Sequence, residues 1–406
     1  MTRISFIMPT FNRAHFIAES IRSITSQMGA DDELLVVDDG STDDTPQVLQ
    51  ALGERFDHVR QDNAGKSVAL NRALARTSGR YVWICDDDDI LYPGAAELLL
   101  RRIERSHADL VFGRYTRFRE VDGRTEEFGT GYWPDLSQGS LTRHILEDSF
   151  VMHNASLVRR SAFEAVGLFD ETMLRSLDYE MFVRLATQVR CAFEDAIIFG
   201  QRKHEGDRGP NTVLHAADES DAVWKEFDRR IFVQLREREG IALFEAMYRA
   251  DDPQAVRRAA LLQRACIMAR HDLWDEALDD FEQAAQASAA PLSATERDIC
   301  RRSVSGKHGF GGILETGPLA RFRALRHGAA GTGVAIARAV LDGLMWRLHA
   351  PEAEPRRQAL GLLWQVGGAS ELPKLLWRRA LSSRGNAPGT PQVEERREID
   401  LSAKRP

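Results

Sequence analysis

The sequence predicts an α/β protein, with a mostly parallel sheet in the first half of the chain and an all-α region in the second half. Two observations lead to this prediction. In the first 92 residues, short apolar runs alternate with segments of helical spacing, which is typical of strands joined by right-handed helical crossovers. From about Ala216 onward, glycine and proline become rarer and long helical patterns take over. Because 406 residues exceed the usual size of one core, we expect two domains.

The composition is that of an ordinary globular protein, with 43% hydrophobic and 28% charged residues. The four cysteines lie far apart and form no CxxC pair, so neither a zinc site nor a disulfide framework is indicated. The first apolar run, ISFIMP, is too short for a secretory signal, and no run approaches the roughly 20 residues of a membrane span. We therefore expect a cytoplasmic protein.

Charge is distributed unevenly along the chain. Residues 301–406 contain 18 Lys and Arg against 9 Asp and Glu, although the net charge of the whole chain is −7. An acidic body is a poor nucleic-acid binder, whereas a basic end can meet an anionic surface.

The first half of the chain is interpreted element by element. Residues 3–9 read as a buried strand, and Asn12 is a plausible N-cap of the helix that follows. A second apolar run, residues 34–37, ends in Asp38 and Asp39, and the polar residues after it lead into a second helix. We expect a third strand at 56–60, a helix at 66–76 and a fourth strand at 81–85. Ligands of such sheets bind beyond the carboxyl ends of the strands, where Thr10, Asp39 and the run Asp86–Asp89 would meet.

The four consecutive aspartates, Asp86–Asp89, are the most informative stretch. Carboxylates packed at the end of a buried strand repel one another, so we expect a positive partner there. A hard divalent cation with phosphate oxygens is the natural candidate. The alternative is a solvated acidic turn that caps the helix beginning near Pro93. Neither GxGxxG nor GxxxxGK[ST] occurs at these turns, so a glycine-rich phosphate loop is unsupported.

Several ordered motifs resemble one family. IMPTFNRAHFIAESIRSITSQ, LLVVDDGSTDDT and DNAGKSVALNRALARTSGRYVWICDDDDILYP, followed by SLVRRSAFEAVGLFDETMLRSLDYEMFVRLA, are similar to family 2 glycosyltransferases with the GT-A fold. The resemblance covers about residues 3–205. It implies a GT-A domain, Rossmann-like with a mostly parallel sheet and flanking helices, in front of the helical region.

The resemblance also implies roles for individual residues. The presumed catalytic base is Asp178, although Leu177 stands where relatives carry a glutamate. Asp88 is the expected metal ligand, joined by His204, which with Arg202 resembles an RxH motif. The remaining expected contacts, all to the nucleotide sugar, are Pro9, Thr10, Asn12, Asp39, Lys66, Asp86 and Asp87. Asp178 could instead cap a helix, and His204 could be an ordinary surface histidine.

The implied activity is that of an inverting glycosyltransferase dependent on Mn²⁺ or Mg²⁺. A divalent ion neutralises the leaving diphosphate, and one carboxylate takes the proton of the acceptor hydroxyl. The donor would be a nucleotide-diphosphate sugar, with UDP favoured because the family uses it most, and the acceptor a glycan, a lipid-linked glycan or another hydroxyl. Trp133 and His153 could contact the acceptor, but such residues near a sheet are more often core, and they are left out of the expected site.

The expected domain limits are 1–215 for the catalytic domain, 216–384 for a helical domain and 385–406 for a disordered tail. Residues 253–287 resemble one tetratricopeptide-like hairpin, although a plain helical bundle explains them as well. Basic helices with Trp346, Trp364 and Trp377 suggest a peripheral contact with the inner face of an anionic membrane. The alternative is that these helices pack on the acidic catalytic domain with their tryptophans buried.

Two other functions remain open from the sequence. The first is a transferase-like scaffold that has lost turnover and binds partners through its helical half. The second is a nucleotidyltransferase, but those enzymes usually carry a glycine-rich basic loop after the first strand, and PTFNRAHF is not one.

Overall fold

A computed structural model describes residues 3–53, 55–203, 220–306, 311–328, 331–351, 353–368, 373, 389–399 and 401. The chain divides into two compact units. The first unit holds residues 1–135, 149–227 and 401–406, and the second holds residues 136–148 and 228–400. The chain thus leaves the first unit for a short segment, returns to it, and later continues into the second unit.

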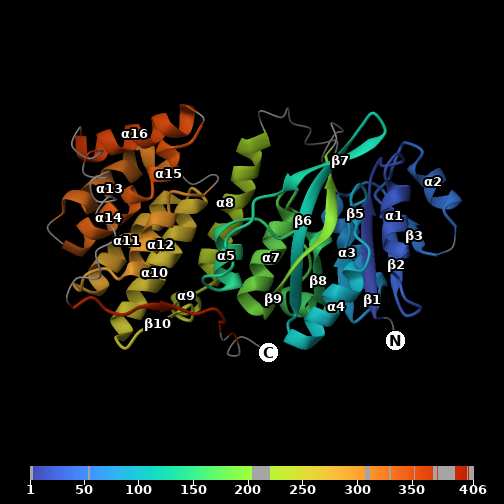
Figure 1. Ribbon diagram of the computed structural model, residues 1–406, viewed down its shortest axis with the longest axis horizontal. Helices are drawn as coiled ribbons and strands as arrows, with labels where there is room; N and C mark the ends of the chain where they lie inside the picture. Colours follow the sequence, from blue (N-terminus) through green and yellow to red (C-terminus); the bar gives the residue numbers. More distant parts are fainter. Residues whose placement is uncertain are drawn as a thin grey trace. The chain divides into compact units, whose positions relative to one another are not determined.

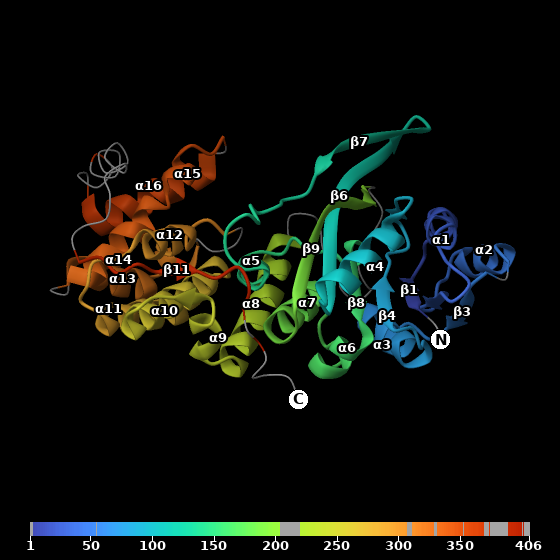
Figure 2. The same cartoon turned by 60° about the horizontal axis from the view of Figure 1, so that its bottom comes forward.

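The first unit is built on a nine-stranded sheet with strand order β3-β2-β1-β4-β8-β6-β9-β5, and β7 pairs with β6 (Figure 1). The strands are β1 (Ile4–Thr10), β2 (Glu33–Asp38), β3 (Asp57–Arg60), β4 (Tyr81–Ile84), β5 (Ile90–Leu91), β6 (Leu110–Val121), β7 (Arg124–Thr130), β8 (Ser156–Arg159) and β9 (Cys191–Arg202). The β6–β7 hairpin projects beyond the other strands (Figure 2).

The helices of this unit lie between the strands along the chain. They are α1 (Ile17–Thr25), α2 (Thr45–Ala51), α3 (Lys66–Arg76), α4 (Ala95–Ser106), α6 (Arg160–Val166) and α7 (Leu177–Gln188), with the 3₁₀ turn η1 (His153–Ala155) before β8. The alternation of strand and helix up to residue 106 confirms the predicted α/β architecture.

Strands β3, β2, β1 and β4 run parallel, which fixes where a ligand can bind. β1 lies between β2 and β4, so the chain reverses its direction across the sheet at β1. The crevice beyond the carboxyl ends of β1 and β4 is the topological switch point of such a sheet. The other half is mixed, because β8 pairs antiparallel with both β4 and β6.

The core explains why these runs form central strands. All seven residues of β1 and all four of β4 are buried, as expected for strands covered on both faces. Phe6 on β1 stacks on Trp83 of β4, with ring centroids 5.6 Å apart. Burial of such side chains stabilises each by about 1.5–3 kcal/mol and makes the sheet a rigid base for the loops at its edge.

The second unit is mostly helical. Its helices are α5 (Leu141–Glu147), most of α8 (Ser220–Arg238), α9 (Ile241–Glu245), α10 (Pro253–Arg270), α11 (Trp274–Ala287), α12 (Ala294–Arg302), α13 (Thr316–His327), α14 (Gly331–Asp342), α15 (Met345–Leu348) and α16 (Ala353–Gly367), with the 3₁₀ turn η2 (Gly312–Leu314). α10 and α11 pack as a pair at the place of the expected hairpin.

A buried polar cluster ties the inserted helix α5 to the rest of this unit. Glu147 accepts hydrogen bonds from Arg302 at 3.1 Å, Arg143 at 3.2 Å and Gln263 at 2.9 Å. Burial raises the pKa of Glu147, but Arg302, Arg143 and Arg270 outweigh it and hold that pKa well below its usual range. The cluster therefore keeps a carboxylate charged in the interior, as a buried charge requires when it is well paired.

The structure differs from the sequence expectations at the end of the chain. Instead of a continuous disordered tail from residue 385, β11 (Glu394–Glu395) pairs antiparallel with β10 (Tyr248–Arg249), and Val393 is buried. Glu395 also pairs with Arg143 at 2.6 Å. The units divide at Phe227 and Asp228 rather than at residue 215, and residues 136–148 join the helical unit. A pattern of helical spacing cannot show such pairing over distance.

Within the described ranges, no helix is long and apolar enough to cross a membrane. The amphipathic run around residues 334–348 is divided into α14 and α15, and Trp377 lies outside the described residues.

Candidate active site at the carboxyl ends of the strands

Asp86–Asp89 form the turn directly after β4, at the switch point of the sheet. Asp87 and Asp89 are buried. The side chains of Asp86 and Asp88 keep 36% and 18% of their surface exposed. Two of the four carboxylates are therefore available to a ligand, and two belong to the interior.

Two cationic side chains of the protein lie against these aspartates. Lys66, the first residue of α3, places Nζ 2.5 Å from Oδ1 of Asp86. Nε of Arg13, in the loop after β1, lies 3.5 Å from Asp87 and 3.8 Å from Asp88. The positive partner that the sequence requires is thus supplied in part by the protein itself.

The pKa values show how closely these charges act on one another. Burial, followed by the charge of Asp88, raises the pKa of Asp87 to about 7, although Arg13 lowers it. Burial lowers the pKa of Lys66, but Asp86, Asp178 and Asp87 outweigh it and raise the pKa above its usual value. Lys66 therefore keeps its charge, and it experiences Asp86, Asp87 and Asp178 together.

The sequence analysis missed Asn154, which holds the acidic turn from η1. Its Oδ1 accepts a hydrogen bond from the backbone amide of Asp86 at 2.6 Å, and its Nδ2 donates to Oδ2 of Asp89 at 2.5 Å. Its backbone oxygen accepts from Nε1 of Trp83 at 3.0 Å. Asn154 is buried and interrupts an apolar stretch, and that polar residue in a core segment is the one signal that could have drawn attention to it.

Arg202 at the end of β9 also supports the acidic turn. Its backbone amide donates to Asp89 at 2.8 Å, and its Nε donates to the backbone oxygen of Asp88 at 3.0 Å. Its guanidinium also pairs with Glu19 and Glu120. Arg202 thus shapes the turn, and its role in an RxH motif stays a prediction, because His204 lies outside the described residues.

Asn12 fixes the loop after β2 instead of capping α1. Its Oδ1 accepts hydrogen bonds from the backbone amides of Thr42 at 2.8 Å and Asp43 at 3.3 Å. Its own backbone has a φ of 54°. The N-cap of α1 is Phe16, so the predicted capping role of Asn12 was wrong.

Pro9, Thr10 and Asp39 meet at the ends of β1 and β2. The amide of Asp39 donates to the backbone oxygen of Thr10 at 2.8 Å, and Pro9 lies opposite Val37 in the sheet register. The carboxylate of Asp39 accepts from the amides of Ala64 and Gly65, each at 2.8 Å. Asp39 therefore orders the loop that carries Lys66, and its contact with a base or ribose stays a prediction.

Asp178 and Glu180 both occupy the first turn of α7, but only Asp178 is free to react. Glu180 is buried and forms a bidentate pair with Arg184 at 2.6 and 2.7 Å. Asp178 is half-buried, and in the described part of the chain its one hydrogen bond is from the amide of Tyr179 at 2.9 Å. Its charge raises the pKa of Lys66, whose Nζ lies 2.5 Å from Oδ1 of Asp86 in the acidic turn.

The residues present fit a divalent ion that is bound mainly by a diphosphate and water. Among the described residues, no three His, Cys, Asp or Glu side chains gather in a geometry that could hold a metal by themselves. Mg²⁺ or Mn²⁺ in such sites needs only one or two protein carboxylates. The partly exposed Asp86 and Asp88 supply oxygens of that kind. The assignment of Asp88 as a metal ligand stays a prediction.

Comparisons with known proteins find glycosyltransferases that are similar to the N-terminal part of the chain. The sequence profile described as Glycosyl transferase family 2 matches residues 5–167. The chain is 25% identical over 239 residues to an uncharacterized glycosyltransferase of Rickettsia typhi, which covers 57% of this chain and 73% of the relative. It is 30% identical over 222 residues to a chondroitin synthase of Escherichia coli, but that match covers 53% of this chain and only 30% of the synthase.

A solved structure shows a similar fold. The crystal structure of S. aureus TarS 1-349 in complex with UDP-GlcNAc matches with a TM-score of 0.51 at 16% identity, covering 98% of each chain. This neighbour supports the GT-A fold of the N-terminal part of the chain. Residues 5–167, in the N-terminal part of the chain, therefore form a family 2 glycosyltransferase domain with the GT-A fold.

Proposed function

We propose that the chain is an inverting, metal-dependent glycosyltransferase that moves a sugar from a nucleotide-diphosphate sugar, with a UDP-sugar favoured, to a hydroxyl of a glycan, lipid-linked or other acceptor. The observation that carries this proposal is the convergence of two separate segments, the acidic turn and α7, on Lys66 of α3. The charges of Asp86 and Asp87 after β4 and of Asp178 on α7 all act on this side chain. A cation between carboxylates is ready to change partners when an anionic diphosphate arrives.

In this proposal the loops after β1, β2 and β4 bind the donor. Pro9, Thr10 and Asp39 would line the nucleotide, and Lys66 would leave Asp86 for the diphosphate. Asp88 would hold a Mn²⁺ or Mg²⁺ ion, which supplies charge neutralisation for the leaving diphosphate. The donor's charge is then stabilised by groups that are already in place, so little reorganisation is needed at the moment of reaction.

Asp178 would act as the general base. Among the residues that the structure describes, Asp178 forms no ion pair, whereas its neighbour Glu180 pairs with Arg184. The charge of Asp178 acts on Lys66. A carboxylate in hydrogen-bond reach of the acceptor hydroxyl can take its proton as the oxygen attacks the anomeric carbon. Attack from the face opposite the leaving diphosphate gives inversion without a covalent intermediate.

We further propose that an acceptor held in an anionic membrane brings the protein to the membrane surface. Three large apolar side chains of the helical unit are exposed: Trp346 at 47%, Leu360 at 45% and Trp364 at 66%. The exposed Arg357 precedes Leu360 and Trp364 at helical spacing on α16, so the three side chains share one face of that helix. Exposed aromatic and basic residues on one face suit an interfacial position.

A donor panel tests the main proposal. Thermal unfolding would be followed with UDP-, GDP-, TDP- and CMP-sugars, including UDP-GlcNAc, each with and without Mn²⁺. A donor at 100 times its Kd should add about 2.7 kcal/mol of stability, and the gain should depend on the metal. Release of sugar from that donor then separates an enzyme from a scaffold that binds without turnover. Failure of every donor to stabilise the protein would overturn the proposal.

A further inference from the structure

His153 on η1 is buried in the first unit without a hydrogen bond to its ring. Its side chain and backbone are only 6% exposed, and among the described residues neither Nδ1 nor Nε2 has a partner. The ring packs between Phe169, at 5.5 Å, and Phe182, at 5.1 Å between centroids. Apolar contacts therefore hold the ring, and its polar edges are left uncompensated.

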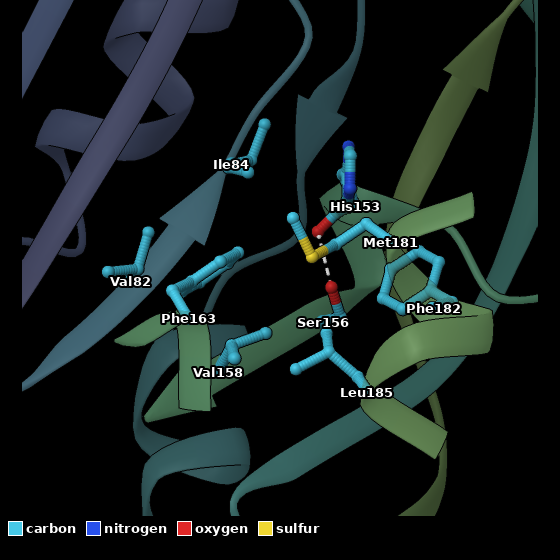
Figure 3. Close-up of a pocket in the computed structure, with 9 residues that line it drawn as sticks. All are labelled: Val82, Ile84, His153, Ser156, Val158, Phe163, Met181, Phe182 and Leu185. Atoms are coloured by element: carbon cyan, nitrogen blue, oxygen red, sulfur yellow. Dashed lines mark hydrogen bonds between the residues drawn. The ribbon is translucent and has the colours of Figure 1, made fainter. Parts of the chain in front are cut away.

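An unpaired polar group in the interior costs about 1–3 kcal/mol, so a phenylalanine would fill this place more cheaply. A hydrogen-bond partner for the His153 ring cannot lie in the small apolar space that His153 helps to line, shown in Figure 3. That space has no room for a water molecule, and Val82, Ile84 and Leu185 help to line it. Its one hydroxyl, on Ser156, donates to the backbone oxygen of His153 at 3.0 Å (Figure 3). The partner of the imidazole must therefore come from another direction.

The other direction is that of the candidate active site. Asp178 lies one helical turn before Phe182 on α7, so both side chains share the face that packs on His153. The neighbouring Asn154 holds Asp86 at 2.6 Å. The 3₁₀ turn η1 thus carries two neighbouring residues: Asn154 hydrogen-bonds the acidic turn, and His153 packs on Phe182 of α7, the helix that carries Asp178.

Burial and the neighbouring charges set the protonation state of the His153 imidazole. Burial lowers the pKa of His153 to about 4, although Asp178 and Asp86 raise it, while Lys66 lowers it further. The imidazole is therefore neutral at physiological pH and carries one donor and one acceptor. A diphosphate offers acceptors alone, whereas a sugar hydroxyl offers both a donor and an acceptor, which makes it the better match.

We propose that His153 is a specificity-determining residue that hydrogen-bonds a hydroxyl of the transferred sugar at the floor of the donor site. This inference rests on the proposed function. The sugar is attached to the diphosphate, and Asp178 must face its anomeric carbon, so the sugar lies between the acidic turn and α7. The donor sugar, rather than the acceptor, is the partner because His153 is buried beside the acidic turn, while the acceptor enters from solvent. Protein atoms cover both ring nitrogens, so donor binding must move a side chain that covers them.

The test compares the free nucleotide with the nucleotide sugar. His153→Phe keeps an aromatic ring and removes both polar edges, whereas His153→Gln keeps one donor and one acceptor. Phe182→Leu is the control, because it loosens the same packing and leaves the imidazole in place. Calorimetry in Mn²⁺ would measure the affinity of each protein for UDP and UDP-GlcNAc, or for the matching pair that the donor panel selects.

We expect His153→Phe to bind UDP within about twofold of the wild type and the UDP-sugar about tenfold more weakly, since one neutral hydrogen bond contributes about 0.5–1.5 kcal/mol. His153→Gln should recover part of the loss, and Phe182→Leu should keep the ratio of the two affinities. In ¹⁵N spectra of the wild-type protein, the imidazole signal missing from His153→Phe should shift with the UDP-sugar but not with UDP.

This proposal would be overturned if His153→Phe kept the wild-type ratio of affinities for UDP and the UDP-sugar, or if the His153 signal did not shift with the UDP-sugar. Either result would leave the proposed function intact. The spectra follow the wild-type protein, and the His153 signal can be assigned from either His153→Phe or His153→Gln, so they decide the matter even where one of these variants does not fold. A wild-type protein that binds no nucleotide sugar would remove both proposals.

Discussion

The side chain of Asn154 closes a hydrogen-bonded ring on the acidic turn: its Oδ1 accepts from the amide of Asp86 at 2.6 Å, and its Nδ2 reaches Oδ2 of that residue at 3.4 Å. The same Nδ2 lies 2.5 Å from Asp89. One buried amide thus sets the spacing of two carboxylates that would otherwise repel each other.

Asn154→Ala should therefore lower both stability and donor affinity. The amide of Asp86 and the buried carboxylate of Asp89 each lose a partner, which costs about 1–3 kcal/mol. The apparent KM for the donor should rise by about tenfold or more as the turn loses its spacing. Asn71→Ala is the matched control, because the Asn71 side chain likewise accepts from a backbone amide and donates to an oxygen, the N and O of Phe169 at 2.9 and 3.0 Å, away from the acidic turn. Equal donor KM values in the two variants would show that Asn154 serves stability alone.

Asp88→Ala should abolish transfer and remove the part of nucleotide affinity that depends on Mn²⁺. Its side chain is partly exposed and sits 3.8 Å from Arg13, so its removal should leave the fold intact. Calorimetry of UDP with and without Mn²⁺ measures the effect, and the exposed Asp57 supplies the control variant Asp57→Ala. Full activity of Asp88→Ala, or undiminished wild-type activity in EDTA, would rule out the metal assignment.

Asp178→Asn should lower kcat by about 100-fold or more while donor affinity barely changes, since the amide keeps the shape and cannot accept a proton. Glu180→Gln should instead lower stability and leave kcat nearly unchanged. It breaks a buried pair with Arg184, so the main loss should be in thermal stability. If donor affinity of Asp178→Asn falls together with kcat/KM, then Asp178 belongs to the nucleotide site instead.

Glu147 should make the helical unit sensitive to acid. Its pKa in the folded protein lies below the usual value, so its contribution is present above about pH 4.3 and is lost as the pH falls. Glu147→Gln should destabilise the protein by about 3–5 kcal/mol at pH 7, and the difference should shrink towards pH 3. Denaturant titrations between these pH values measure it. Glu282→Gln, at an exposed pair with Arg321, should change stability by less than about 1 kcal/mol. A difference that stays constant with pH would contradict the role of Glu147.

The membrane proposal predicts salt-sensitive binding to anionic liposomes. Replacing Trp346 and Trp364 by serine should weaken co-sedimentation, since each exposed ring could contribute about 1 kcal/mol or more on insertion. Trp224→Ser, at a residue that is 37% exposed on α8, is the control. Failure of the wild-type protein to bind at low salt would leave these tryptophans without a membrane role.

The sequence predicted much of the first unit because its signals are local. Buried strands such as β1 and β4 appear as apolar runs, and the polar residues that end them fall on one edge of a parallel sheet. Asp86–Asp89, Asp39 and Lys66 were found in this way or through the family resemblance. Asn12 was assigned to the wrong contact, because spacing along the chain showed the helix ahead of it but not the loop after β2 that it holds.

What the sequence by itself determined is thus the α/β order of elements, the position of the acidic turn at the end of β4 and the helical character of the second half. Only the tertiary structure decided which polar groups meet. Asn154 and Asp89 are 65 residues apart, and Glu147 and Arg302 are 155 residues apart. Periodicity records which face of an element is buried, whereas a hydrogen bond depends on where the folded backbone brings two distant segments together. For that reason the buried imidazole of His153, which looked like an ordinary core residue in the sequence, became a candidate sugar contact only when its neighbours were known.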